Sequence, residues 1–137
     1  MSASLAPYLN FDGNTREVME FYRDLLGGEL SVSTFAEFGA PVSDGYRDKI
    51  MHSTLEADGI SFMASDAQEG RSPVVGNNIS LSLAGGPADA DRLAAVFTGL
   101  ADGGTTLVPL AESPWGATFG MLIDKFGIQW LVNISKE

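Results

Sequence analysis

The sequence predicts an α+β fold of two βαβββ modules, with curled mixed β-sheets and helices on the outside, and three observations support this. The stretch Asp58-Gly59-Ile60-Ser61-Phe62 recurs in altered form as Phe126-Gly127-Ile128-Gln129-Trp130. Each copy ends a block with the same order of signals, which is strand, helix, Gly-Gly, strand, strand, strand. Three consecutive strands with hairpin turns favour mixed sheets over the parallel sheet that alternating strands and helices would form.

The first module covers about residues 6–66 and begins with a predicted strand over residues 7–11. Asn14 is the predicted N-cap of a helix, and Glu17 follows three residues later, as in a capping box. Gly27-Gly28 ends this helix, because glycine adopts the left-handed conformation at low cost. Apolar residues at helical spacing predict its buried stripe, which consists of Val18, Phe21, Tyr22, Leu25 and Leu26.

Three more strands complete the first module. Residues 30–38 alternate loosely between polar and apolar types and predict the second strand. Residues 39–45 have the composition of a loop, and residues 46–57 predict the third strand. Asp58-Gly59 is a strong hairpin signal, and it leads into a fourth strand over residues 60–64.

The second module covers about residues 77–134 and follows a linker, residues 65–77, without periodicity. Its helix is predicted over residues 88–101, with Leu93, Val96, Phe97 and Leu100 facing inward. Gly103-Gly104 ends this helix as Gly27-Gly28 ends the first. The predicted strands are 79–83, 105–110, 115–123 and 128–134, with a turn at Asp124-Lys125-Phe126-Gly127. We expect a single domain, residues 1–137, whose two modules share a cleft between their inner faces.

Composition limits the classes of function. The chain has 137 residues, no cysteine and a net charge of −10. The absence of cysteine excludes disulfides, thiolate zinc sites and cysteine nucleophiles. An acidic surface repels phosphate backbones and anionic lipids, so we predict no nucleic-acid partner and no membrane partner. No apolar run approaches the roughly 18 residues of a membrane span. We also predict no signal peptide and a cytoplasmic location.

Short motifs, taken in order, resemble the vicinal oxygen chelate superfamily of glyoxalases, bleomycin resistance proteins and extradiol dioxygenases, and within it the PhnB-like branch. The resemblance runs from about residue 6 to residue 134. It implies the paired-module fold and a homodimer. The matching stretches are Pro7-Tyr8-Leu9, Phe11-Asp12-Gly13-Asn14, Phe21-Tyr22, Leu26-Gly27-Gly28, Met51-His52, Ser65-Asp66, Gly103-Gly104, Asp124-Lys125-Phe126-Gly127 and Trp130.

The resemblance also places the positions at which metal-dependent members hold a divalent ion with His and Glu side chains. In this sequence the four positions are Pro7, Met63, Asn78 and Leu131. The repeat agrees, because Met63 follows Phe62 as Leu131 follows Trp130. These residue types do not form a useful ligand set for a hard divalent ion. We therefore predict no metal site and no cofactor, and neither glyoxalase I nor dioxygenase chemistry.

His52 is the only histidine in the sequence, and it lies on the predicted third strand. The PhnB-like branch often has histidine at this position. An imidazole titrates near neutral pH, so His52 is a candidate catalytic base or ligand-binding residue. The alternative is a structural histidine that packs within the strand. Alternation places Ile50 and Thr54 on its face and Met51 and Ser53 on the other.

Two carboxylates and three aromatic residues complete the set of candidates. Glu56 and Asp66 lie nearest the expected cleft, and we interpret Asp66 as a cap for the loop after its strand. Phe62 and Trp130 are predicted to face the helices and join the core. Trp115 lies at a loop-to-strand junction, where it is a candidate for lining the mouth of a cleft.

Two functions remain open. The first is a PhnB-like protein of unknown specific activity that binds a small molecule in a cleft without the superfamily metal. The second is a metal-independent enzyme of isomerase or lyase type, with His52 as the catalytic base. The predicted ligand-binding residues are Tyr8, His52, Met63, Asn78, Trp115 and Leu131.

Two further observations bear on the function. The acidic surface favours a cationic ligand, and bleomycin resistance proteins, which the outline resembles, bind such a ligand in their grooves without a metal. Some relatives carry a methyltransferase description. The sequence has no glycine-rich nucleotide loop on a Rossmann-type unit, which argues against that activity.

Overall fold

The computed structural model describes residues 3–137, and the chain divides between Val74 and Val75 into two compact units. Unit 1 contains β1 (Tyr8–Phe11), α1 (Thr15–Leu26), β2 (Glu29–Thr34), the short 3-10 helix η1 (Asp44–Tyr46), β3 (Ile50–Ala57) and β4 (Ile60–Asp66). Unit 2 contains β5 (Ser80–Gly85), the short 3-10 helix η2 (Pro87–Asp89), α2 (Ala90–Ala101), β6 (Thr105–Glu112), β7 (Thr118–Ile123) and β8 (Gln129–Ile134). The two predicted βαβββ modules are confirmed.

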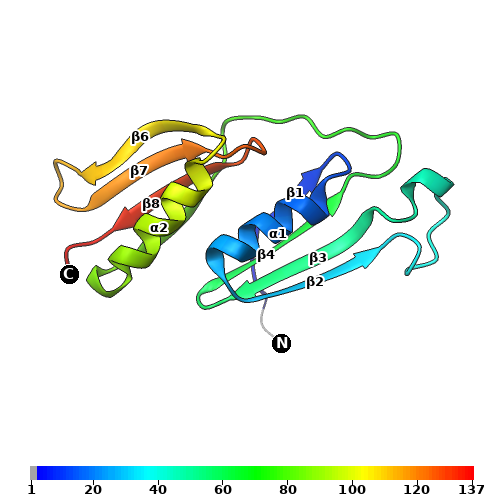
Figure 1. Ribbon diagram of the computed structural model, residues 1–137, viewed down its shortest axis with the longest axis horizontal. Helices are drawn as coiled ribbons and strands as arrows, with labels where there is room; N and C mark the ends of the chain where they lie inside the picture. Colours follow the sequence, from blue (N-terminus) through cyan, green and yellow to red (C-terminus); the bar gives the residue numbers. More distant parts are fainter. Residues whose placement is uncertain (1–2) are drawn as a thin grey trace. The chain divides into compact units, whose positions relative to one another are not determined.

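Each unit builds a four-stranded mixed sheet, and the two sheets have the same topology. The strand orders are β1-β4-β3-β2 and β5-β8-β7-β6. The first and last strands of each unit pair in parallel, and the other neighbours pair antiparallel. Short turns join β3 to β4, β6 to β7 and β7 to β8, whereas residues 35–49 join β2 to β3. Each parallel pair requires a long connection. Figure 1 shows each helix lying across one face of its own sheet.

The core of unit 1 lies between α1 and the sheet. The helix buries Val18, Met19, Tyr22 and Leu26, and the sheet buries Leu55, Phe62 and Ala64. The Tyr22 ring meets the Phe62 ring edge-on, with centroids 5.7 Å apart. Fully burying a large apolar side chain stabilises a fold by about 1.5–3 kcal/mol. The predicted stripe is confirmed in Val18, Tyr22 and Leu26, while Phe21 and Leu25 are only half-buried.

The core of unit 2 repeats this arrangement. All four residues predicted to face inward from α2, Leu93, Val96, Phe97 and Leu100, are buried. Leu83, Leu122, Trp130 and Val132 cover them from the sheet. Phe62 and Trp130 are 3% and 2% exposed, which confirms the prediction that both belong to the core.

A β-bulge in unit 1 changes which side chains share a face with His52. Ser33 pairs with His52, but the next residue of β2, Thr34, pairs with Ile50, so Met51 has no partner on β2. The extra residue shifts the alternation by one step. Ile50 therefore enters the core, where it is 1% exposed. The prediction that Ile50 shares the face of His52 is wrong.

The segment between β2 and β3 also departs from prediction. The second strand ends at Thr34, because Thr34 and Glu37 form a hydrogen-bonded turn. The third strand begins at Ile50, because Tyr46 belongs to η1. The Tyr46 ring packs against Phe35, and the Tyr46 hydroxyl donates to the carbonyl of Ala67. Burial raises the pKa of Tyr46. Tyr46 therefore attaches the segment between β2 and β3 to the residues that directly follow β4.

The second unit differs from prediction mainly at one hairpin. β7 begins at Thr118 and not at residue 115, because residues 113–117 form a tight turn. The amide of Gly116 donates to the carbonyl of Ser113, and the amide of Ser113 donates to the carbonyl of Ala117.

Within the described residues, no helix has the length and apolar character needed to cross a membrane.

The Gly-Gly pair after each helix has a steric cause. Gly28 has φ 88°, and a Cβ there would lie 2.1 Å from the Glu56 carbonyl oxygen on β3. A Cβ on Gly104 would lie 2.2 Å from the Ile123 carbonyl oxygen on β7. In both units the chain that leaves the helix therefore passes directly against the backbone of the sheet. A side chain at either position would force the two apart.

We predict that Gly28→Ala lowers the free energy of unfolding by about 3 kcal/mol or more, because the methyl group meets backbone that cannot move aside. Gly27→Ala is the matched control. Gly27 has φ 80° and ψ −168°, a conformation that only glycine adopts readily, but no neighbouring atom lies within 4 Å of the new Cβ. A loss of about 1–3 kcal/mol from backbone strain alone is therefore expected. Urea unfolding of the two variants measures both values. Equal losses would contradict the steric explanation.

Candidate functional site

The face of each sheet that points away from its helix is called here the open face. On the open face of unit 1, Tyr8, Met63, Thr54 and Ser31 lie side by side across β1, β4, β3 and β2. Most of the residues on this face are polar. Its other members are Asn10, Glu29, Ser33, His52, Glu56, Ser61 and Ser65.

His52 is held from both sides by a hydrogen-bond network. Its Nδ1 lies 3.3 Å from the Tyr8 hydroxyl, and its Nε2 lies 3.2 Å from Thr54 Oγ1. The Tyr8 and His52 rings are tilted by 41°, with centroids 5.9 Å apart. Tyr8 is on β1 and reaches across β4 to the ring on β3. His52 and Thr54 are half-buried, whereas Tyr8 is 45% exposed.

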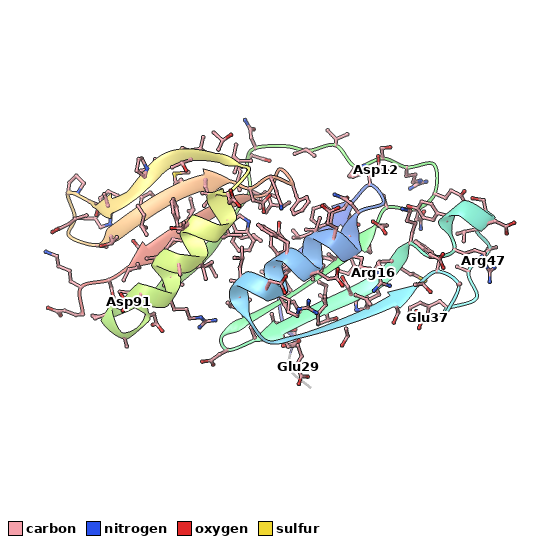
Figure 2. The ribbon with its side chains drawn as sticks, in the orientation of Figure 1. Asp12, Arg16, Glu29, Glu37, Arg47 and Asp91 are labelled. Carbon is pink, nitrogen blue, oxygen red and sulfur yellow. The ribbon has the colours of Figure 1, made fainter. Side chains whose placement is uncertain are left out.

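Two further polar contacts flank this network. Ser65 donates to Asn10 Oδ1 at 3.3 Å, and Ser61 donates to Glu56 Oε1 at 3.0 Å. Glu56 pairs directly with Glu29 across the β2–β3 ladder, and both are exposed. Figure 2 labels Glu29 at the start of β2. The two exposed carboxylates make this end of the open face negative. Because like charges placed opposite one another repel, they also destabilise this end of the β2–β3 pair.

The open face of unit 2 has the opposite character. Its centre consists of Val108, Met121 and Leu131, side by side on β6, β7 and β8. Phe119 and Ile123 extend the apolar area along β7. The remaining members are Ser80, Ser82, Ala84, Thr105, Ala111, Gln129 and Asn133.

Trp115 and Asn78 lie at the margins of unit 2. Trp115 is on the β6–β7 hairpin and is 66% exposed, and its ring meets Phe119 edge-on with centroids 5.6 Å apart. Asn78 is exposed and lies before β5 begins. The predicted ligand-binding residues therefore fall into two sets. The structure gathers Tyr8, His52 and Met63 on the open face of unit 1. In unit 2 it places Leu131 on the open face and Trp115 against Phe119.

The register shows which positions of the two units correspond. Met63 pairs with Tyr8 and Thr54, whereas Leu131 pairs with Ser82 and Met121. Tyr8 therefore corresponds to Ser82.

Pro7 precedes β1. Its carbonyl oxygen accepts a hydrogen bond from the Met63 amide at 3.0 Å. Strand alternation had placed Thr54 on the face of His52, but sequence spacing named neither Thr54 nor Asn10 as a ligand-binding residue.

The residues at these positions do not fit a divalent ion. Met63 and Leu131 are apolar, and both nitrogens of His52 already have partners within the sheet. A metal would have to displace Tyr8 or Thr54 to reach the ring. Among residues 3–137, no three His, Cys, Asp or Glu side chains form a group that could hold a metal ion.

Of the two carboxylates expected near a cleft, Asp66 has a structural role. It is 3% exposed, and its Oδ1 accepts from the Thr15 amide at 3.0 Å while its Oδ2 accepts from the Ile50 amide at 2.8 Å. The first contact caps α1. The predicted capping box is wrong, since Asn14 makes no side-chain cap. The interpretation of Asp66 as a cap for the following loop is wrong too, because alternation along β4 directs it toward the helix.

Two shallow hollows lie elsewhere. The first follows α1 and is lined by Arg16, Glu17, Glu20 and Asp24 among others; Figure 2 labels Arg16 on this helix. The second lies between α2 and β6, beside Phe97 and Pro109. Both are on the helix side of their units, so neither belongs to the open faces.

The fold is that of the vicinal oxygen chelate superfamily. The fosfomycin resistance protein FosX from Listeria monocytogenes, solved as a mutant with Mn(II) and 1S,2S-dihydroxypropylphosphonic acid, aligns with a TM-score of 0.63. The alignment covers 97% of this chain and 93% of that chain at 11% identity. A likeness at this level of identity concerns the fold alone.

Sequence comparison then places the chain in a family. It matches the family model described as 3-demethylubiquinone-9 3-methyltransferase over residues 3–133. The chain belongs to this family, the PhnB-like branch of the superfamily, as the sequence motifs predicted.

Three relatives match over nearly their whole length. Protein PA1353 from Pseudomonas aeruginosa is 36% identical, with a TM-score of 0.81 over 99% of this chain and 100% of that chain. The PhnB protein of Bacillus cereus is 26% identical, with a TM-score of 0.73 over 97% and 100%. Protein YjdN of Escherichia coli (strain K12) is 28% identical over 145 residues, which cover 97% of this chain and 96% of YjdN.

We predict that Asp66→Ala lowers the free energy of unfolding by about 3 kcal/mol, because it leaves two buried amides without an acceptor. Asp66→Asn, which keeps one acceptor oxygen, should lose less. Asp12→Ala is the control, since Asp12 is an exposed carboxylate near the same helix end (Figure 2). Its expected effect is within about 0.5 kcal/mol. Thermal or urea unfolding measures all three, and a small effect of Asp66→Ala would contradict the capping role.

Proposed function

We propose that the protein binds a small organic molecule on the open faces of its sheets, without the divalent ion of the metal-dependent superfamily members. One observation carries the proposal. At the position corresponding to a metal ligand stands Met63, and the polar groups beside it form the Tyr8–His52–Thr54 network. The face therefore offers hydrogen-bonding groups where a metal site would require histidine and carboxylate ligands.

The apolar open face of unit 2 supports the same proposal. Phe119, Met121 and Leu131 are half-exposed neighbours on a sheet face, and Trp115 is largely exposed beside them. Apolar side chains gathered on a surface mark an interaction site more often than scattered ones do. An aromatic ring with an exposed face is well suited to a ligand with an apolar or aromatic part.

The metal-independent enzyme with His52 as base receives less support. A catalytic base is commonly oriented by a carboxylate. In the described part of the chain, the hydrogen-bond partners of His52 are Tyr8 and Thr54, and the nearest carboxylate on its strand, Glu56, accepts from Ser61. We therefore retain binding as the proposed function.

The family description names methyl transfer to a demethylubiquinone, and we do not extend that activity to this chain. Nucleotide-type methyl donors bind at the carboxyl ends of parallel strands in doubly wound sheets. The two sheets described here are mixed βαβββ sheets. The open faces instead favour direct binding of a small molecule.

We predict that small aromatic probes bind to the open faces and can be detected through the methionines. Met63 lies on the open face of unit 1, Met121 on that of unit 2, and Met19 is fully buried under α1. With 13C-methyl-labelled methionine, benzylammonium, benzoate and benzyl alcohol are titrated separately. Binding should shift the Met63 or Met121 methyl resonance and leave Met19 in place.

Conservative substitutions assign the signals and provide the control. Met63→Leu and Met121→Leu each remove one resonance. Met51, on the bulge of β3, serves as an exposed methionine outside the open-face rows. Shifts confined to Met51, or no shift of Met63 and Met121 with any of the three probes, would contradict the proposed function.

We predict that divalent ions leave the protein unchanged. A ligand that binds the native state raises its melting temperature, and at a given concentration a tighter ligand raises it more. Mn(II), Ni(II), Zn(II) and Fe(II) should therefore not raise the melting temperature, and chelator treatment should not alter probe binding. Stoichiometric metal in the purified protein, measured by elemental analysis, would contradict this prediction.

A further inference from the structure

The most exposed member of the Tyr8–His52–Thr54 network is Tyr8, not His52. Both ring nitrogens of His52 are engaged within the sheet, at 3.3 Å by Tyr8 and at 3.2 Å by Thr54. The ring is half-buried, whereas Tyr8 is 45% exposed. A ligand that approaches the open face therefore meets the Tyr8 hydroxyl first.

We propose that Tyr8 is the side chain that contacts the ligand, that His52 is a positioning residue which sets the direction of the Tyr8 hydroxyl, and that the ligand group received there is an N–H donor of the ammonium class. The inference rests on the proposed function, because it names the ligand chemistry of the same face.

The direction of the hydroxyl follows from the two partners of the ring. A neutral imidazole donates through one nitrogen and accepts through the other. A phenol is a stronger acid than the aliphatic alcohol of threonine, so it is the better donor to the nitrogen that holds the lone pair. Nδ1 then accepts from Tyr8, and Nε2–H donates to Thr54. The Tyr8 oxygen is left with lone pairs that point to the ligand, and it accepts a hydrogen bond.

The charges around the network favour the same ligand class. On the open face, Tyr8 on β1 and Ser33 on β2 adjoin His52, and β4 contributes the uncharged Ser61, Met63 and Ser65. The carboxylates of this face, Glu56 on the strand of His52 and Glu29 paired with it on β2, lie four residues further along, about 13 Å away. The residues assigned to this open face include no lysine or arginine. An ammonium group bonded to the Tyr8 oxygen would therefore meet no opposing cation on this face, and the two carboxylates would attract it weakly.

Protonation of His52 should reverse the role of Tyr8. A charged imidazolium donates through both nitrogens, so the Tyr8 oxygen must accept from Nδ1. The Tyr8 hydrogen then points to the ligand, and the hydroxyl becomes a donor. The added positive charge on the ring also opposes a cation. Binding of an ammonium should weaken as the ring is protonated.

The tautomer is tested without a ligand. His52 is the only histidine, so a single set of 15N imidazole resonances reports on it. We expect the proton on Nε2 and the lone pair on Nδ1 at alkaline pH. Tyr8→Phe should move the Nδ1 resonance. The matched control is Tyr46→Phe, which removes the same atom from a tyrosine whose hydroxyl bonds Ala67, and it should leave the His52 resonances in place.

The ligand class is tested with two probes of the same shape, benzylammonium and benzoate, read through the Met63 methyl resonance. Benzylammonium should bind about tenfold more tightly than benzoate when His52 is neutral, as expected for a hydrogen bond to a charged group. Tyr8→Phe should abolish most of this preference, and Tyr46→Phe should preserve it. The preference should decline along the titration curve of the His52 15N signals.

The outcomes separate this inference from the proposed function. Probe binding at Met63 with equal affinities, or a preference that survives Tyr8→Phe, overturns the inference and leaves the proposed function standing. A proton on Nδ1 in the neutral protein overturns the assigned direction. If neither these two probes nor benzyl alcohol shifts Met63 or Met121, both proposals fail.

Discussion

One packing arrangement underlies both units: a single helix buries its apolar stripe against one face of a four-stranded sheet. Strands direct alternate side chains to opposite faces, so covering one face determines which residues are left on the other. Phe62 is in the core because α1 covers it, and Met63 is on the open face because it follows Phe62. The candidate site is the part of each sheet that its helix does not cover.

The position of each helix depends on close contacts at its ends. Gly28 and Gly104 bring the chain against the sheet backbone after α1 and α2, so both units use the same device at this end. The other end differs. In unit 1 the buried Asp66 caps α1 from the sheet, whereas in unit 2 Asp89 accepts from the Gly86 amide next to its own helix. The two units therefore share their fold but use different hydrogen bonds at the N-terminal ends of their helices.

The chemistry of the open faces has diverged further than the framework. Corresponding positions carry Tyr8 and Thr54 in unit 1 but Ser82 and Met121 in unit 2. One face offers hydrogen bonds beside carboxylates, and the other offers apolar and aromatic surface. Each face therefore presents a different chemistry to its surroundings. A shared fold therefore does not fix the chemistry of a sheet face, which depends on the residues that the face carries.

The sequence by itself determined the βαβββ repeat, the PhnB-like family and the core positions of Phe62 and Trp130, because periodicity and turn signals are local properties. Tertiary structure decided the rest. Ile50 left the face of His52 because a bulge shifted the register, and Asp66 became a helix cap because β4 ends under the Thr15 amide. The contact of His52 with Tyr8 joins residues 44 positions apart. Only the pairing of β1 with β4 brings them together, since contacts between distant strands depend on register, which no local pattern encodes.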